Sequence, residues 1–280
     1  MQNCIQAQTR MRLLHLVLII GAVSSSRSET PSSVQRSLGS TMEEDLSIFV
    51  RLTGRGLTAP LHWERDDWRN AGGTVLITAV SSLLDDEAYA VVLRNRTATH
   101  DKFERVFEAY SNGLSGIIFS SVLYSSGLLF DSEWLRGSGL IMASALTISA
   151  ITQTTLKYIA GRSRPYTGTS YRTFRPFSFN SDYVSFPSGH TIVAFTISTV
   201  LARRIDKVYA SIALYTLATL GGLSRIYSGN HWLSDVVFGG ALALSVSSSV
   251  IKWYEGETTG DDRGFHIIPQ ANRLTLVWRF

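Results

Sequence analysis

The sequence has little cysteine and little charge. Its 280 residues include one cysteine, Cys4 in the N-terminal segment, so the rest of the chain has no internal disulfide, cysteine-based metal site or thiol nucleophile. Charged residues make up 17% of the chain and hydrophobic residues 45%, whereas an ordinary soluble domain is about 25% charged. The composition therefore favours membrane-associated or deeply buried helices.

The charged residues that are present do not form a nucleic-acid-binding pattern. The net charge is +4, but Lys and Arg are scattered and no basic stripe interleaved with aromatic residues occurs. We therefore expect no nucleic acid partner, and an anionic substrate or a membrane surface fits the charge better. No cluster of metal ligands is visible, so we expect neither a metal nor another cofactor. The sequence does not indicate an oligomeric state.

Residues 1–24 have the order of an export signal. Arg10 and Arg12 precede the apolar run 13–23, and small residues follow. The apolar run is shorter than the about 20 residues that span a bilayer, so we expect a cleaved signal peptide, with an uncleaved anchor as the alternative. Residues 25–70 are rich in Ser, Thr and Gly, and we expect a linker and N-terminal segment there.

Residues 71–255 consist of apolar runs separated by Gly, Pro and charged stretches, a pattern that predicts an all-α bundle of about six helices. Three runs are uncharged and close to the span of a hydrocarbon core, which favours a transmembrane bundle. The other three are short or interrupted, so a soluble bundle of buried helices is the alternative. The predicted helices are Thr74 to Leu93, Ser111 to Phe130, Gly137 to Ile159, Thr191 to Leu201, Val208 to Leu223 and Leu233 to Trp253.

Residues 256–280 form a C-terminal tail. The run LTLVWRF alternates in the manner of a strand, and a turn is expected at Pro269 to Asn272. The tail is therefore predicted to form a short hairpin, with a disordered segment as the alternative.

The first group of residues that can carry chemistry is KYIAGRSRP, residues 157–165. Lys157 and Arg164 are seven residues apart, so they share nearly one face if the helix continues to Arg164. Pro165 ends the helix and leaves the Arg164 guanidinium free to bind an anion. The pattern indicates an oxyanion clamp or, alternatively, a basic cluster that meets lipid headgroups at the membrane surface.

The second group is FPSGH, residues 186–190. Pro187 and Gly189 predict a tight turn, and Ser188 is a natural N-cap for the uncharged helix that follows. The free backbone N–H groups of that helix end would suit a phosphate-like anion. His190 is placed to donate a proton to a leaving group. The alternative is an N-cap followed by an interfacial histidine whose hydrogen bonds are satisfied.

The third group is SRIYSGNHWLSD, residues 224–235. His231 is expected to begin the last helix, and Asp235 follows four residues later on the same face. The carboxylate could then hold one imidazole nitrogen and leave the other as a nucleophile or base. Arg225 adds a third cation. A His–Asp pair at this spacing can also be an ordinary hydrogen bond.

If the helices run antiparallel, all three groups lie at one end of the bundle. Arg203, Arg204 and Lys207 lie at the opposite end. Since basic residues tend to stay in the cytoplasm, the three groups are predicted to face the periplasm. The export signal agrees with this orientation.

Together the three groups resemble the three-part signature of the type-2 phosphatidic acid phosphatase superfamily. They occur complete and in order: Lys157, six residues, Arg164-Pro165; Pro187-Ser188-Gly189-His190; and Ser224-Arg225, five residues, His231, three residues, Asp235. The resemblance covers roughly residues 73–255. It implies a helical core, usually of six helices in membrane members, and hydrolysis of phosphate esters without a metal.

The resemblance also implies a role for each motif residue. His231 would attack phosphorus to give a phosphohistidine, Asp235 would orient it and stabilise its charge, and His190 would protonate the leaving oxygen. The phosphoryl oxygens would be held by Lys157, Arg164, Ser188, Gly189 and Arg225. Three cations and a helix N-terminus can supply the charge neutralisation that other enzymes take from Mg²⁺.

The sequence thus predicts a phosphatase of the bacterial cell membrane with its active site in the periplasm. Its partners would be membrane lipids, and its substrate a lipid phosphate or diphosphate such as phosphatidate, phosphatidylglycerol phosphate, polyprenyl diphosphate or a lipid A phosphate. The first alternative is a soluble periplasmic acid phosphatase of broad specificity. A vanadium-dependent haloperoxidase, which resembles the same superfamily, and a helical scaffold without activity are the others.

Overall fold

The structure, a computed structural model, describes residues 38–259, 264–270 and 273–279. The expected signal peptide, residues 1–24, lies outside the described residues. The chain divides into two compact units, residues 1–41 and 42–280. Of the first unit only residues 38–41 are described, as the first turn of a helix. The motif residues all belong to the second unit.

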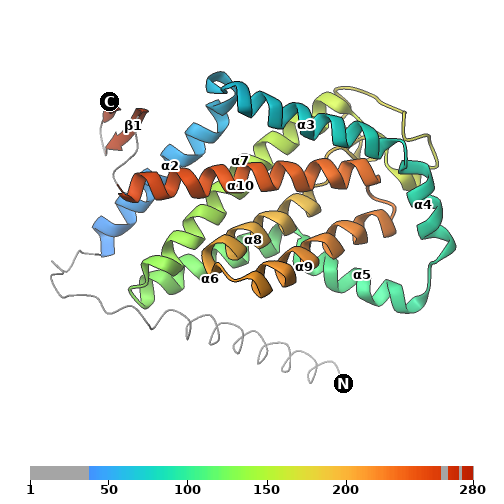
Figure 1. The fold of residues 1–280 in the computed structure, drawn as a ribbon, viewed down its shortest axis with the longest axis horizontal. Coiled ribbons are helices and arrows are strands. Elements are labelled where there is room, and N and C mark those ends of the chain that lie inside the picture. The colour runs from blue at the N-terminus through green and yellow to red at the C-terminus, as the bar shows by residue number, and fades with distance from the viewer. Residues whose placement is uncertain (1–37, 260–263, 271–272, 280) are drawn as a thin grey trace. The chain divides into compact units, whose positions relative to one another are not determined.

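The described residues are mostly helical, which confirms the expected all-α bundle (Figure 1). The α-helices are α2 (Leu38–Thr58), α3 (Arg65–Ser82), α4 (Asp85–Arg94), α5 (Ala98–Ser111), α6 (Gly113–Leu129), α7 (Glu133–Ala160), α8 (Gly189–Ile205), α9 (Val208–Tyr227) and α10 (Leu233–Thr259). Short 3₁₀ turns are η1 (Ala59–His62), η2 (Pro165–Thr167) and η3 (Ser181–Tyr183).

Helix α8 is the central helix of the bundle and contacts α5, α6, α7, α9 and α10. Its side chains at Ile192, Ala194, Ile197 and Val200 are at most 2% exposed. Apolar groups that are this well buried hold a helix firmly against its neighbours, because each contributes its full transfer free energy. The N-terminal end of α8, where FPSGH lies, is thus fixed in place by the core.

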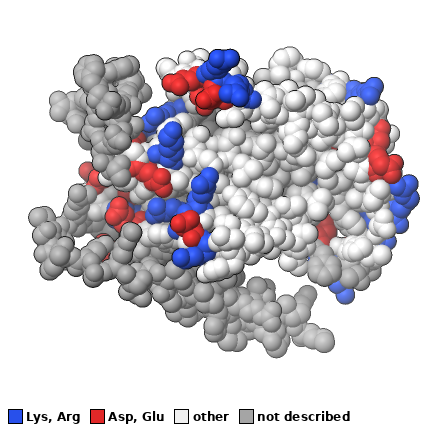
Figure 2. Space-filling view, viewed as in Figure 1, with Lys and Arg blue, Asp and Glu red and all other residues white. Residues whose placement is uncertain are grey.

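Helices α7 and α10 are long and apolar enough to cross a membrane, over Glu133–Ala160 and Leu233–Thr258. Helix α6 is apolar but shorter. Figure 2 shows a broad uncharged surface with charged side chains gathered towards its edges. Large apolar side chains are also exposed on other helices, including Leu76 of α3, Leu114 of α6 and Ile212 of α9. An apolar surface of this extent is typical of a protein that meets lipid.

The helix predicted over Thr74 to Leu93 is wrong in its bounds, because the chain turns at residues 83–84 and separates α3 from α4. The reason lies at Asp85, the first residue of α4. Its side chain is fully buried and accepts hydrogen bonds from Arg162 and from Ser234. The turn at residues 83–84 thus directly precedes a buried carboxylate at the start of α4.

Two helices lie where none was expected. Much of α2 falls in residues 25–70, which the sequence analysis assigned to a linker. It is held by the buried side chains Ile48 and Leu52 and by an Arg51–Glu257 ion pair of 2.6 Å. Helix α5 is capped by Thr97, whose hydroxyl accepts from the backbone N–H of His100 at 3.2 Å. Both helices are amphipathic, so their apolar residues do recur at helical spacing. They were missed because neither contains the long uncharged run on which the prediction of helices relied.

The C-terminal hairpin is confirmed. Strand β1 (Gly264–Gln270) pairs antiparallel with β2 (Arg273–Arg279), from Gly264 opposite Arg279 to Gln270 opposite Arg273. The closing pair brackets residues 271–272, within the predicted turn.

Candidate active site

The three predicted groups meet at one cavity of about 290 Å³. It lies where the C-terminal ends of α7 and α9 come together with the N-terminal end of α8 and the loop before α10, on the right in Figure 1. The motif residues that line it are Lys157, Arg164, Gly189, His190, Arg225 and His231. Ser188 and Asp235 are fully buried and do not line the cavity. Glu108, Gln153 and Asn230 also line it and were not predicted.

His231 lies in the loop just before α10, which begins at Leu233. Its side chain is 3% exposed, and its Nδ1 atom is 2.7 Å from the backbone carbonyl of Ser185. Because a carbonyl only accepts hydrogen bonds, this contact places the proton on Nδ1 and leaves Nε2 with a free lone pair. Burial lowers the pKa of His231 to about 4, so the imidazole is neutral at pH 7. This is the state that a nitrogen nucleophile requires.

Asp235 does not contact His231 in the predicted way. The distance from Asp235 Oδ2 to His231 Nδ1 is 3.8 Å, too long for a hydrogen bond. Oδ2 instead accepts from the Ser185 hydroxyl at 2.5 Å and from the Trp232 backbone N–H at 2.8 Å. The predicted pairing fails because His231 precedes the helix. Asp235 thus positions His231 through Ser185, and its negative charge lies close enough to stabilise an imidazolium.

Arg162 connects Asp235 to a second buried carboxylate, and sequence reasoning missed it. Its guanidinium donates to Asp235 Oδ1 at 2.6 Å, to Asp85 Oδ2 at 2.7 Å and to the Ser234 hydroxyl at 2.7 Å. All three charged side chains are at most 5% exposed. Arg162 belongs to the group KYIAGRSRP, residues 157–165, but its spacing from the other cations in that group does not show that it binds buried carboxylates. One feature of the sequence could have indicated Asp85: it belongs to an acidic run that interrupts an apolar segment.

Asp85→Ala is expected to lower the free energy of unfolding by about 3–5 kcal/mol, because it leaves part of the Arg162 guanidinium buried without its partner. Asp86→Ala is the matched control, since Asp86 is exposed in the same first turn of α4. The measurement is denaturant-induced unfolding of the two purified variants in detergent. Equal stability of both variants would contradict a structural role for Asp85.

Lys157 and Arg164 both reach the cavity, although the predicted shared helix face is wrong. Helix α7 ends at Ala160, and Gly161 has a φ of 57°. A Cβ atom at Gly161 would lie 1.8 Å from the Arg175 carbonyl oxygen, so only glycine fits there. Lys157 Nζ donates to the Val184 carbonyl at 2.6 Å.

Arg164 lines the cavity and does not use all of its donors within the described residues. Its Nη1 donates to the Asn230 side chain at 2.8 Å, whereas its Nε is buried and has no hydrogen-bond partner in the described part of the chain. Buried polar groups are nearly always hydrogen-bonded. Two cations that line one cavity, Lys157 and Arg164, therefore favour an anionic ligand there.

The start of α8 has the predicted capped geometry. Ser188 is the N-cap, and its hydroxyl accepts from the Thr191 backbone N–H at 3.5 Å and from the Thr191 hydroxyl at 2.9 Å. Gly189 faces Gln153 so closely that a Cβ atom would lie 2.5 Å from the amide nitrogen. His190, the second residue of the helix, is half-buried and lines the cavity. Its role as proton donor remains a prediction.

Arg225 is placed at the cavity but is not a free cation. Its side chain is 2% exposed, and its guanidinium donates to Glu104 and, at 3.2 Å, to Glu108 of α5. The sequence analysis expected Arg225 to hold phosphoryl oxygens. In the structure these carboxylates already occupy part of its hydrogen-bonding capacity.

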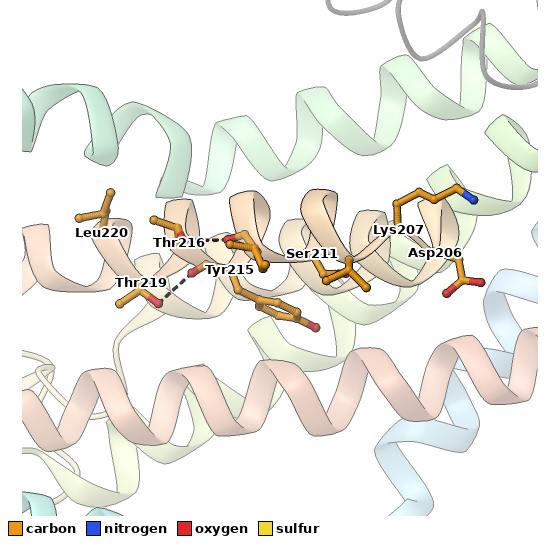
Figure 3. A pocket seen from close by; sticks show the side chains of 9 residues that line it. Asp206, Lys207, Ser211, Tyr215, Thr216, Thr219 and Leu220 are labelled. Atoms are coloured by element: carbon orange, nitrogen blue, oxygen red, sulfur yellow. Dashed lines mark hydrogen bonds between the residues drawn. The ribbon is translucent and has the colours of Figure 1, made fainter.

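A second hollow of about 660 Å³ lies along α9, away from these residues (Figure 3). The side chains that line it include Tyr215, Thr216 and Thr219. The two threonine hydroxyls donate to carbonyls of their own helix, at 2.7 and 2.8 Å. None of the motif residues lines this hollow, so the candidate chemistry belongs to the smaller cavity.

Part of this chain is similar in sequence to phosphatases of known name. The lipid A 1-phosphatase of Porphyromonas gingivalis is 38% identical over 92 residues, which cover 32% of this chain and 18% of that protein. Phosphatidylglycerophosphatase B of Bacillus subtilis is 29% identical over 133 residues, 44% of this chain and 60% of that protein. The chain thus spans less than two thirds of the length of these relatives.

A solved structure has the same fold. It is described as the first transmembrane PAP2 type phosphatidylglycerolphosphate phosphatase from Bacillus subtilis. The match has a TM-score of 0.53 at 20% identity and covers 68% of this chain and 96% of that one. Residues 138–258 also match the family described as the PAP2 superfamily. The expected superfamily is confirmed: residues 138–258, which contain all three motif groups, belong to the PAP2 superfamily.

Proposed function

We propose that this chain is a membrane phosphatase that hydrolyses a lipid phosphate or diphosphate through a phosphohistidine intermediate, without a metal ion. The observation that carries the proposal is the meeting of a neutral buried imidazole, His231, with His190 and the cations Lys157 and Arg164 at one cavity. A nucleophile, a proton donor and charge for the phosphoryl oxygens are the groups that phosphoryl transfer requires.

The first step transfers the phosphoryl group to His231. Nε2 attacks phosphorus and forms the N–P bond, while the bond from phosphorus to the leaving oxygen breaks and His190 gives that oxygen a proton. Burial and the nearby cations lower the pKa of His190 to about 3, so this step requires that the negative charge of the bound phosphate raise that pKa and protonate His190. The proton stays on Nδ1, which donates it in a hydrogen bond to the Ser185 carbonyl. The positive charge that develops on the ring is stabilised by Asp235, 3.8 Å away.

The second step hydrolyses the phosphohistidine. His190, now unprotonated, takes a proton from a water molecule, whose oxygen attacks phosphorus as the N–P bond breaks. Inorganic phosphate leaves, and both histidines return to their starting states. Lys157, Arg164 and the backbone N–H groups at the start of α8 neutralise the phosphoryl oxygens in both steps.

Three observations support a lipid substrate at a membrane. The cavity lies at the ends of α7 and α10, the two helices that are long and apolar enough to span a bilayer. The named relatives act, by their names, on lipid A and on phosphatidylglycerophosphate. Arg204 donates to Ser138 and to the carbonyl of Trp134 near the start of α7. The basic residues at the turn from α8 to α9, which include Arg204, therefore lie at the end of the bundle opposite the cavity. By the positive-inside tendency the cavity then faces the periplasm.

A comparison of substrates in EDTA tests this proposal. We expect the purified protein to release phosphate from phosphatidate in detergent at least tenfold faster, by kcat/KM, than from phenyl phosphate, and EDTA to leave the rate unchanged. Equal or faster turnover of phenyl phosphate would favour a soluble acid phosphatase. Loss of activity in EDTA that Mg²⁺ restores would contradict metal-independent catalysis.

A further inference from the structure

Arg225 is held by two glutamates of α5, a helix that packs along α9 (Figure 1). The two differ in burial: the Glu104 side chain is 15% exposed and the Glu108 side chain 44%. Glu104 does not line the cavity, whereas Glu108 does. Glu104 therefore serves as the buried counterion of Arg225, and Glu108 presents a carboxylate to the space that the substrate would occupy.

The charges around the cavity suit a phosphomonoester. Lys157, Arg164 and Arg225 line it, and Glu104 offsets the charge of Arg225 from behind. Because Glu108 also pairs with Arg225, the net charge of these five side chains is +1, which suits the charge of a monoester phosphate better than the larger charge of a diphosphate. Glu108 adds a negative charge that this phosphate does not need for its own neutralisation.

Glu108 lies where the group attached to the reacting phosphate would pass. A cavity of about 290 Å³ has room for a phosphoryl group and part of what is attached to it, but not for a whole lipid, so the lipid chains must extend out of it. His231 and Arg225 are 3% and 2% exposed, whereas Glu108 is nearly half exposed, which places Glu108 towards the opening.

We propose that Glu108 determines specificity, by selecting phosphomonoesters against diphosphates; this rests on the proposed function. A second phosphate next to the reacting one would bring its negative charge to the Glu108 carboxylate, and the two would repel. A hydroxyl or ammonium group at the same place would instead donate a hydrogen bond to the carboxylate. Specificity often depends on such a repulsive contact with the wrong substrate.

Binding of two unreactive anions to Glu108→Gln and wild-type protein tests the proposal without any need for turnover. The probes are orthophosphate and methylenediphosphonate, titrated by calorimetry in detergent. We expect the variant to improve the affinity for methylenediphosphonate at least tenfold more than that for orthophosphate, about 1.4 kcal/mol. Glu87→Gln is the control, since it removes the same charge from an exposed ion pair with Arg94 outside the cavity.

The outcomes separate this inference from the proposed function. An unchanged affinity ratio, or an equal gain for both anions, would overturn the role of Glu108. A parallel assay compares kcat/KM for polyprenyl diphosphate and phosphatidate, and the ratio should rise tenfold in Glu108→Gln and stay unchanged in Glu87→Gln. A wild-type protein that hydrolyses neither lipid would overturn the proposed function, while the affinity ratio would still test Glu108.

Discussion

His231→Ala is expected to reduce phosphate release at least a thousandfold for every substrate that the wild-type protein hydrolyses. The substitution removes Nε2, the atom that would form the bond to phosphorus, and losses of this size are usual when a covalent nucleophile is removed. Lys157 and Arg164 remain, so the variant should still bind orthophosphate. The fall should therefore appear in kcat with little change in KM, measured as phosphate released from phosphatidate in detergent.

The control for this substitution is His62→Ala, because His62 is exposed at the end of η1 and lies outside the cavity. Rapid acid-free quenching of the wild-type protein with radiolabelled substrate should trap phosphate on the chain in a form that is stable to alkali and labile to acid, as expected for a phosphohistidine. Retained turnover in His231→Ala, or label on that variant, would reject His231 as the nucleophile.

The members of the site were predictable from sequence because their chemistry is local. FPSGH is an N-cap and turn within five residues, and α8 begins at Gly189 as that pattern predicts. The helices of the core were also predictable, since α6, α7, α9 and α10 each extend over a long apolar run. Lys157 and Arg164 were paired on a wrong premise, a continuous helix. They still line one cavity, because the chain turns back at Gly161.

The partners of these residues were not predictable, because they come from distant parts of the chain. Arg162 meets Asp85, 77 residues away, and Arg225 meets Glu104, 121 residues away. Helical spacing carries no information on such contacts, which depend on how α4 and α5 pack against the core. The same limit explains Asp235: the spacing to His231 is helical, but the helix begins two residues too late for the pair to share a face.

His190→Ala is expected to slow phosphoryl transfer to His231, the first step, in proportion to how much the leaving group needs a proton. The leaving group of phosphatidate is the alkoxide of a lipid alcohol, which needs a proton to depart. For phosphatidate the loss should therefore be about a hundredfold to ten-thousandfold, the usual contribution of a general acid. For p-nitrophenyl phosphate, the leaving phenolate is stable without a proton, so phosphoryl transfer to His231 should slow less than tenfold. A role in catalysis thus predicts different losses for two substrates that present the same phosphate to the cavity.

The same substitution should also change which step limits the rate. His190 is the proposed base for the water that hydrolyses the phosphohistidine, so His190→Ala slows the second step for both substrates. With p-nitrophenyl phosphate, stopped-flow absorbance should then show a burst of nitrophenolate stoichiometric with the active sites, followed by slow turnover. His62→Ala should show neither effect. If both substrates lost activity equally and no burst appeared, His190 would be a phosphate-binding residue, since a ligand to the phosphoryl oxygens contributes equally whatever group departs.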